Sequence, residues 1–189
     1  MSRRLEAALL VACLLACAAL RATRLDGMSI WQDEGLSLYR AGMDLDGILG
    51  GEIPLGDLVT TDVHPPLYFV LLGGWFRLVG HGTWTGKWFS LLAGLLALAL
   101  VWALGRRTVG RRAALLAAAL AALTPLYLWY SQEIRSYTLI VTLGLASVYA
   151  IARATGTRVP VRARLAWAAG SVGSVAALLW THYLGFTLL

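Results

Sequence analysis

Long apolar stretches separated by short polar segments make up most of this chain, and they predict helices that cross a membrane. Five of these stretches hold about 15 to 22 residues, near the ~20 that a hydrocarbon core of about 30 Å requires. They cover residues 5–20, 89–104, 113–130, 138–152 and 165–186. The pattern therefore predicts about five transmembrane helices.

A sixth apolar stretch, residues 66–79, is shorter and contains Arg77. Its 14 residues would span roughly 21 Å as a helix, which is too little to cross comfortably. The arginines outside it decide how it lies, because short loops rich in arginine stay in the cytoplasm. Ten of them flank the apolar stretches: Arg3, Arg4, Arg106, Arg107, Arg111, Arg112, Arg153, Arg158, Arg162 and Arg164. All ten are cytoplasmic only if residues 66–79 do not cross, so we expect an interfacial or re-entrant helix against the outer leaflet.

Composition agrees with a membrane protein and excludes other classes. The chain of 189 residues is 59% hydrophobic and 14% charged, whereas soluble domains are roughly a quarter charged. The net charge of +6 does not indicate nucleic-acid binding, because the arginines lie in pairs at the ends of apolar stretches rather than along one helix face. Cys13 and Cys17 lie one helical turn apart in the first stretch, where we expect them to pack against lipid or a neighbouring helix.

With this topology, residues 26–87 form one long outer loop. It holds eight of the ten acidic residues of the chain: Asp26, Asp33, Glu34, Asp44, Asp46, Glu52, Asp57 and Asp62. Loops of this length usually carry function. The expected fold is an all-α polytopic membrane protein with about five transmembrane helices and external juxtamembrane helices in this loop. Residues 1–189 are expected to form one incomplete transmembrane domain, because the chain stops at the end of an apolar stretch.

The first candidate segment is Trp-Gln-Asp-Glu at residues 31–34. Ser29 and Gln32 have the spacing of a capping box, which predicts a helix that begins at Ile30. Gly42 is a typical residue at the end of such a helix. This helix would lie directly after the first membrane span.

Two carboxylates, Asp33 and Glu34, fall in the first turn of that helix, where the helix dipole favours negative charge. A solvated helix start is the ordinary interpretation of such a pair. Asp33 shares a helix face with Ser37 and Arg40, and its place behind Trp31 after a membrane span favours a functional site instead.

The second candidate segment surrounds Asp62 and His64, just before Pro65 and Pro66. The two prolines restrict the backbone where the interfacial helix begins. Asp62 and His64 would therefore be held near the lipid headgroups. The alternative is that they only form a turn and a helix cap.

The third candidate segment is the tight outer turn between the third and fourth spans, which contains Glu133 and Arg135. Its aromatic residues are typical of a membrane interface: Tyr127, Trp129, Tyr130 and Tyr137. Glu133 and Arg135 are either part of a site or a local ion pair at the membrane boundary. The histidines at 64, 81 and 182 lack the spacing of a metal site.

In this order, residues 31–34, 62–68 and 130–137 resemble the N-terminal part of the C-type membrane glycosyltransferases. They are similar to dolichyl-phosphate-mannose protein mannosyltransferases and to the lipid A aminoarabinose transferases. The resemblance covers essentially all 189 residues, and those families continue with further spans. It implies an integral protein of the bacterial inner membrane that uses a polyprenyl-phosphate sugar donor on the outer face. Protein, lipid or glycan could be the acceptor.

The resemblance also implies roles for single residues. Asp33 matches the catalytic base, Glu34 completes the acidic pair and Glu133 matches the second acidic position. Substrate contacts are expected at Arg40, Asp62, His64, Arg135 and Tyr137. The aminoarabinose transferases carry a lysine near the position of His64, which leaves open which cation meets the donor phosphate. A divalent cation is possible in this chemistry, but the sequence does not indicate one.

The chemistry is consistent with these residues. Phosphate leaves readily, so the reaction needs a base for the acceptor hydroxyl more than a strong acid. A displacement in one step would invert the anomeric carbon, by analogy with inverting glycosidases. The main alternative is a transporter or lipid flippase. Such proteins place ionisable residues within their spans, whereas residues 91–104, 113–130, 138–150 and 165–181 contain no Asp, Glu, Lys or Arg.

Overall fold

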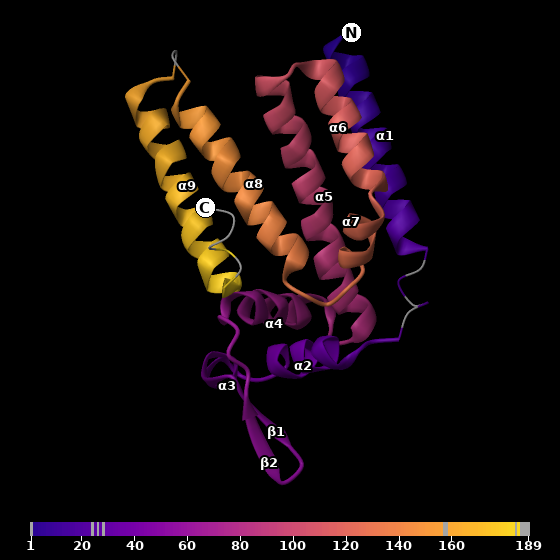
Figure 1. Cartoon of the computed structure of the whole chain (residues 1–189), viewed down its shortest axis with the longest axis vertical. Coiled ribbons are helices and arrows are strands. Elements are labelled where there is room, and N and C mark those ends of the chain that lie inside the picture. The colour runs from indigo at the N-terminus through magenta and orange to yellow at the C-terminus, as the bar shows by residue number, and fades with distance from the viewer. Residues whose placement is uncertain are drawn as a thin grey trace.

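The computed structural model describes residues 2–23, 25, 27, 29–156, 159–183 and 185, and it is mostly helical. Its helices are α1 (Arg3–Ala22), α2 (Gln32–Ala41), α3 (Leu45–Gly50), α4 (Leu67–Val79), α5 (Thr83–Thr108), α6 (Arg111–Leu123), α7 (Pro125–Tyr130), α8 (Tyr137–Ala154) and α9 (Val161–Thr181). In Figure 1, α1, α5, α6, α8 and α9 form a bundle, while α2, α3 and α4 lie across one end of it. We call this end the loop end.

Four helices are long and apolar enough to cross a membrane: α1, α5, α8 and α9. The third predicted span, residues 113–130, is not one continuous helix. It is divided into α6 and α7 at Thr124, whose backbone is extended (φ −63°, ψ 121°). Pro125 causes the break, because the residue before a proline is excluded from the helical region. The helix α6 still occupies the place of a fifth bundle element (Figure 1).

The arginine-bearing segments gather at the end of the bundle opposite the loop end. The start of α1, the α5–α6 turn, the end of α8 and the start of α9 all lie there (Figure 1). Arg158, one of the ten arginines, lies outside the described residues. The buried carboxylate of Glu6 contacts Nε of Arg106 at 2.9 Å and Nε of Arg111 at 3.3 Å. These ion pairs join α1 to α5 and α6. Segments that the charge pattern assigned to one side of the membrane therefore lie together.

Helix α4 contains most of the predicted interfacial segment 66–79, and it runs across the loop end rather than along the bundle (Figure 1). It packs against α2, α3 and the segment between α7 and α8. Their shared core consists of Leu38, Ala41, Ile48, Tyr68, Phe69, Leu72, Phe76 and Ile134. Gly73 permits the close approach, because a Cβ there would lie 2.7 Å from the carbonyl oxygen of Ala41. This packing holds α2 against the bundle.

Helix α2 begins at Gln32, two residues later than predicted, and ends before Gly42 as predicted. Trp31 rather than Ser29 is the N-cap residue, and Oε2 of Glu34 accepts its backbone N–H at 3.2 Å. A free N–H group at a helix start needs such an acceptor. The capping function is therefore provided by Glu34 instead of the predicted pair Ser29 and Gln32.

A β-hairpin, formed by β1 (Glu52–Leu55) and β2 (Leu58–Thr61), was not predicted from the sequence. Leu55 pairs with Leu58, so Gly56 and Asp57 form the turn. Gly56 has a φ of 64°, which glycine adopts without steric cost. Strands of four residues are too short to give a clear alternating pattern. The hairpin projects from the loop end (Figure 1).

The charge pattern and this arrangement predict that the loop end faces the outside of the cell. In a variant free of Cys13 and Cys17, Asp57→Cys at the hairpin turn should react with a membrane-impermeant maleimide on intact cells. Val109→Cys, which is 64% exposed in the α5–α6 turn, should react only after permeabilisation. Labelling of position 109 on intact cells would show that the topology is wrong.

Candidate active site

Residues 131–136, between α7 and α8, form a turn in which all six side chains are buried. We call it the buried turn. The fully buried Arg21, at the end of α1, donates from Nε to Oγ of Ser131 at 2.7 Å and from Nη2 to the carbonyl of Ala122 at 3.2 Å. In return, Gln132 Nε2 donates to the carbonyl of Arg21 at 2.7 Å. Sequence reasoning missed Arg21, although a lone charge at the end of an apolar stretch was a signal.

Glu34 joins the start of α2 to the buried turn. Its Oε1 accepts the backbone N–H of Ile134 at 2.8 Å, and its Oε2 accepts that of Trp31. The residue is 3% exposed, whereas the side chain of Asp33 beside it is 39% exposed. The structure thus separates the two carboxylates of the predicted catalytic pair: Glu34 is a buried tether, and Asp33 is the accessible one.

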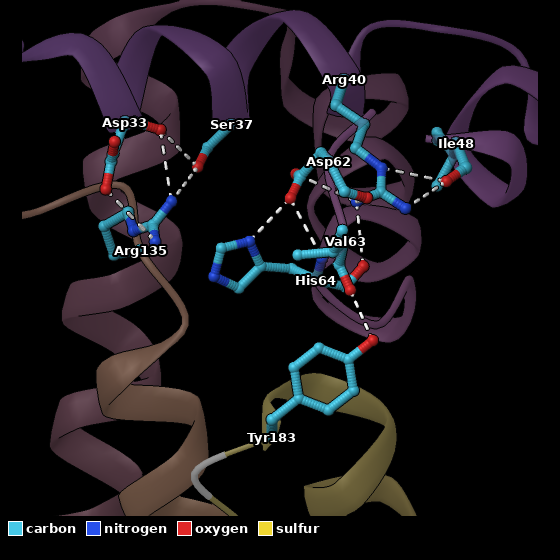
Figure 2. Close-up of polar contacts among 9 residues, drawn as sticks. All are labelled: Asp33, Ser37, Arg40, Ile48, Asp62, Val63, His64, Arg135 and Tyr183. Carbon is cyan, nitrogen blue, oxygen red and sulfur yellow. Dashed lines mark hydrogen bonds and ion pairs between the residues drawn. The ribbon is translucent and has the colours of Figure 1, made fainter. Parts of the chain in front are cut away.

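Asp33 and Arg135 face each other across the gap between α2 and the buried turn (Figure 2). Arg135 Nη2 lies 3.5 Å from Oδ2 of Asp33, and Nη1 donates at 3.4 Å to both the carbonyl of Asp33 and Oγ of Ser37. These contacts are long, since N–H···O hydrogen bonds are ordinarily about 2.9–3.0 Å. Nε of the buried Arg135 has no hydrogen-bond partner among the described residues. Arg135 can therefore donate a hydrogen bond to another acceptor at a shorter distance.

Asp62 and His64 form a second pair beside the first. Oδ1 of Asp62 lies 2.6 Å from Nδ1 of His64 and accepts the backbone N–H of His64 at 3.0 Å. Burial alone would raise the pKa of Asp62, but the hydrogen bonds from His64 and Arg40 hold this pKa well below its usual range. Asp62 is therefore ionised at neutral pH. The second ring nitrogen of His64 points toward the side where Arg135 lies (Figure 2).

Arg40 was predicted to contact substrate, but the structure directs its guanidinium into the loop. Nε and Nη2 donate to the carbonyl of Ile48 at 3.0 and 2.8 Å. Nη1 donates to the carbonyl of His64 at 3.0 Å and lies 3.0 Å from Oδ2 of Asp62. Arg40 is 2% exposed and covers the ring of Phe69 at 4.2 Å. We therefore correct its assignment: Arg40 fixes the loop that presents His64.

One residue of each pair, His64 and Arg135, lines a small cavity. It measures about 10 Å³ and is lined by His64, Tyr68, Phe69, Arg135, Ser136 and Thr181. That is room for about one water molecule. The fold thus brings Asp33, Arg135 and His64, which come from all three predicted segments, to one edge of the loop end.

Glu133 does not line this small cavity. Its Oε1 accepts Nε1–H of Trp129 at 2.5 Å, while Arg135 pairs with Asp33. The local ion pair between Glu133 and Arg135, which the sequence left open, is not formed between these two described side chains. Burial raises the pKa of Glu133 and the charge of Glu34 adds to this, while the hydrogen bond from Trp129 and the charge of Arg135 oppose it.

Tyr137, the first residue of α8, lies next to Arg135. The guanidinium carbon of Arg135 is 5.8 Å from the centroid of its ring, and the ring of Tyr130 packs against it at 4.6 Å. Tyr137 is thus positioned to support the guanidinium. Its direct contact with substrate stays a prediction.

Lys87 lies outside all three predicted segments and was missed as a candidate. The helix α5 starts six residues earlier than the predicted span, so Lys87 falls within it. The residue is 2% exposed, and its Nζ donates to the carbonyl of Leu25 at 2.8 Å. Within the described part of the chain, no group of three or more His, Cys, Asp or Glu side chains is arranged to hold a metal ion.

A model of the dolichyl-phosphate-mannose-protein mannosyltransferase family matches residues 63–184, well over half of the chain. The chain belongs to this family. The match includes His64 and the buried turn but not Asp33. It confirms the resemblance that the three segments indicated.

Among solved structures, ArnT from Cupriavidus metallidurans in the apo state superposes on this family member with a TM-score of 0.75 at 21% sequence identity. The match covers 93% of this chain and 33% of the ArnT chain. The two therefore share the fold, and this chain spans about a third of the length of ArnT. A search of curated proteins finds no match.

The geometry of Arg40 generates a stability prediction. Arg40→Gln should lower the free energy of unfolding by about 3–5 kcal/mol, because it removes a buried cation that pairs with Asp62 and donates to the carbonyls of Ile48 and His64. The measurement is the apparent melting temperature of the purified full-length protein in detergent. Arg77→Gln is the matched control, since Arg77 is exposed on α4. Equal melting temperatures for the two variants would contradict this role.

Proposed function

We propose that the full-length protein is an inverting glycosyltransferase of the bacterial inner membrane. It moves a sugar from a polyprenyl-phosphate donor to an acceptor hydroxyl on the outer face. The observation that carries the proposal is the accessible carboxylate of Asp33 beside the buried guanidinium of Arg135, whose hydrogen-bonding capacity is only partly used. Family membership and the fold shared with ArnT support the reaction class.

Asp33 acts as the base in this mechanism. As the acceptor oxygen attacks the anomeric carbon, its proton passes to the carboxylate of Asp33. The bond between the anomeric carbon and the phosphate oxygen breaks, and the phosphate leaves with the electron pair. Glu34 does not compete for this proton, because both of its oxygens already accept backbone N–H groups. The single accessible carboxylate is consistent with a displacement in one step and inversion.

Arg135 and His64 bind the donor phosphate. A charged phosphate oxygen attracts a guanidinium to shorter distances than the 3.4–3.5 Å contacts that Arg135 makes here. When Arg135 turns to the phosphate, its hold on Asp33 weakens and the carboxylate becomes free to accept a proton. His64 lines the same small cavity as Arg135. Donor binding and activation of the base are thereby coupled.

The side chains exposed at the loop end suit a substrate whose tail stays in lipid. Large aromatic residues are exposed around it, including Trp129 and Tyr183, each at least half exposed. Such residues are typical of the headgroup level of a membrane. The hydroxyl of Tyr183 donates to the carbonyl of Val63 at 2.6 Å, which attaches the end of α9 to the segment that carries His64 (Figure 2).

A transporter or flippase is less consistent with the distribution of charges. Proton- or ion-coupled transport requires ionisable groups near the middle of the bilayer. In α1, the two buried charges, Glu6 and Arg21, lie at opposite ends of the helix and are bound to protein groups. Residues 88–105 of α5 and 165–181 of α9 contain no Asp, Glu, Lys or Arg.

The role of Asp33 predicts a strong effect on turnover. Asp33→Asn in the full-length enzyme should lower turnover by ~10² or more with little change in donor affinity, which is the usual effect of losing a positioned base. Consumption of a radiolabelled polyprenyl-phosphate sugar and equilibrium binding of the same lipid measure the two quantities. Asp46→Asn, exposed in the same loop, is the control. Turnover close to wild type in a folded Asp33→Asn protein would remove Asp33 from this role.

The role of Arg135 predicts a loss of donor affinity, in contrast to the loss of turnover expected for Asp33→Asn. Arg135→Gln should weaken donor binding by about ten- to a hundred-fold, which corresponds to the loss of a charge-assisted hydrogen bond of roughly 1.5–3 kcal/mol. The affinity for the uncharged polyprenol should stay unchanged, because only the phosphate meets the guanidinium. An equal loss for phosphate and alcohol would instead indicate a general structural effect of the substitution.

A further inference from the structure

A second cavity lies beside the candidate active site, and none of Asp33, His64 or Arg135 lines it. Its volume is about 190 Å³, and its walls come from the segment before α2, from α2, α5, α7 and the buried turn. It is lined by Ser29, Trp31, Glu34, Lys87, Trp129, Gln132 and Glu133. Trp31 and Trp129 are 46% and 50% exposed, so two indole side chains of the lining reach the surface.

The polar floor of this cavity holds an acceptor without a partner. Glu133 is 8% exposed, and its Oε1 is bound by Trp129, but its buried Oε2 has no hydrogen-bond partner among the described residues. Buried polar atoms in folded proteins are nearly always bonded. A ligand that donates a hydrogen bond to Oε2 of Glu133 would supply the missing partner.

The lining decides the class of ligand. Phosphate is disfavoured, because the unpartnered Oε2 of Glu133 is itself an acceptor, and the cation in the lining, Lys87, already donates to the carbonyl of Leu25. A hydrocarbon chain is disfavoured, because it would leave the buried Oε2 of Glu133 without a hydrogen-bond donor. A sugar ring fits both parts: its hydroxyl groups can bond the polar floor, and its C–H faces can pack against the flat indole rings.

We propose that this cavity is a carbohydrate-binding subsite, which rests on the glycosyltransferase function proposed above. It holds a sugar ring between Trp31 and Trp129, with one hydroxyl donating to Oε2 of Glu133. Glu34 lies in the wall of the cavity and is the neighbour of Asp33 in the chain, so the subsite adjoins the base. The ring can come from the donor or from a carbohydrate acceptor, and the experiment distinguishes the two sources.

The test uses the full-length protein in detergent and two lipids, polyprenyl-phosphate mannose and polyprenyl phosphate without a sugar. Glu133→Gln keeps the shape of the side chain but replaces one acceptor oxygen by a donor. Trp129→Phe keeps an aromatic ring but removes the indole. Trp84→Phe is the matched control, since Trp84 is 52% exposed on α5 and does not line the cavity.

Three results decide the proposal. A loss of affinity on the order of ten-fold for the mannose lipid, with unchanged affinity for polyprenyl phosphate, assigns the cavity to the donor sugar. Unchanged affinity for both lipids with a raised KM for a carbohydrate acceptor assigns it to the acceptor. Unchanged values throughout, or equal losses for both lipids together with a lower melting temperature, overturn the proposal.

A separate measurement distinguishes failure of this inference from failure of the proposed function. If the wild-type protein binds neither lipid, the proposed function is wrong, and the cavity is then tested by titrating tryptophan fluorescence with free methyl glycosides. The response should occur in the wild type and in Trp84→Phe and be reduced in Trp129→Phe. A wild-type protein without any response overturns the subsite.

Discussion

The arrangement of the site depends on the carboxylate of Glu34, which accepts one backbone N–H from the start of α2 and one from the buried turn. Two segments a hundred residues apart are thereby held together through backbone N–H groups. Asp33 lies next to this tether on α2, and Arg135 follows Ile134 on the turn. The two hydrogen bonds that the Glu34 side chain accepts from backbone N–H groups therefore bring Asp33 and Arg135 to the same place.

Two further buried arginines hold segments of the site in place through hydrogen bonds. Arg21 fixes the buried turn to the end of α1, and Arg40 fixes the loop before α4. Both guanidiniums are surrounded by carbonyl and hydroxyl oxygens, so burial does not leave their N–H groups unbonded. Arg135 differs because its contacts are long and its Nε has no partner in the part of the chain that the structure describes. This difference separates an arginine that holds the fold from one that is ready for an anion.

The helix α4 gives the site its position relative to the bundle. It lies across the ends of the long helices and shares one apolar core with α2, α3 and the buried turn. Short polar segments can then be held at the edge of an apolar bundle, where a lipid-linked substrate would arrive. The two cavities at this edge differ in chemistry: one is bordered by Arg135 and His64, the other by carboxylates and indole rings.

The sequence by itself determined the membrane class, most of the long helices and the grouping of the arginines, because hydrophobic length and charge are properties of local segments. It also indicated the three segments that meet at the loop end. Only the tertiary structure decided which side chains are available. It engages Glu34 and Arg40, leaves Asp33 exposed and the buried Arg135 with spare hydrogen-bonding capacity, and places Lys87 and Glu133 in the lining of one cavity. These outcomes depend on hydrogen bonds between residues up to about a hundred positions apart, and no local pattern encodes such partners.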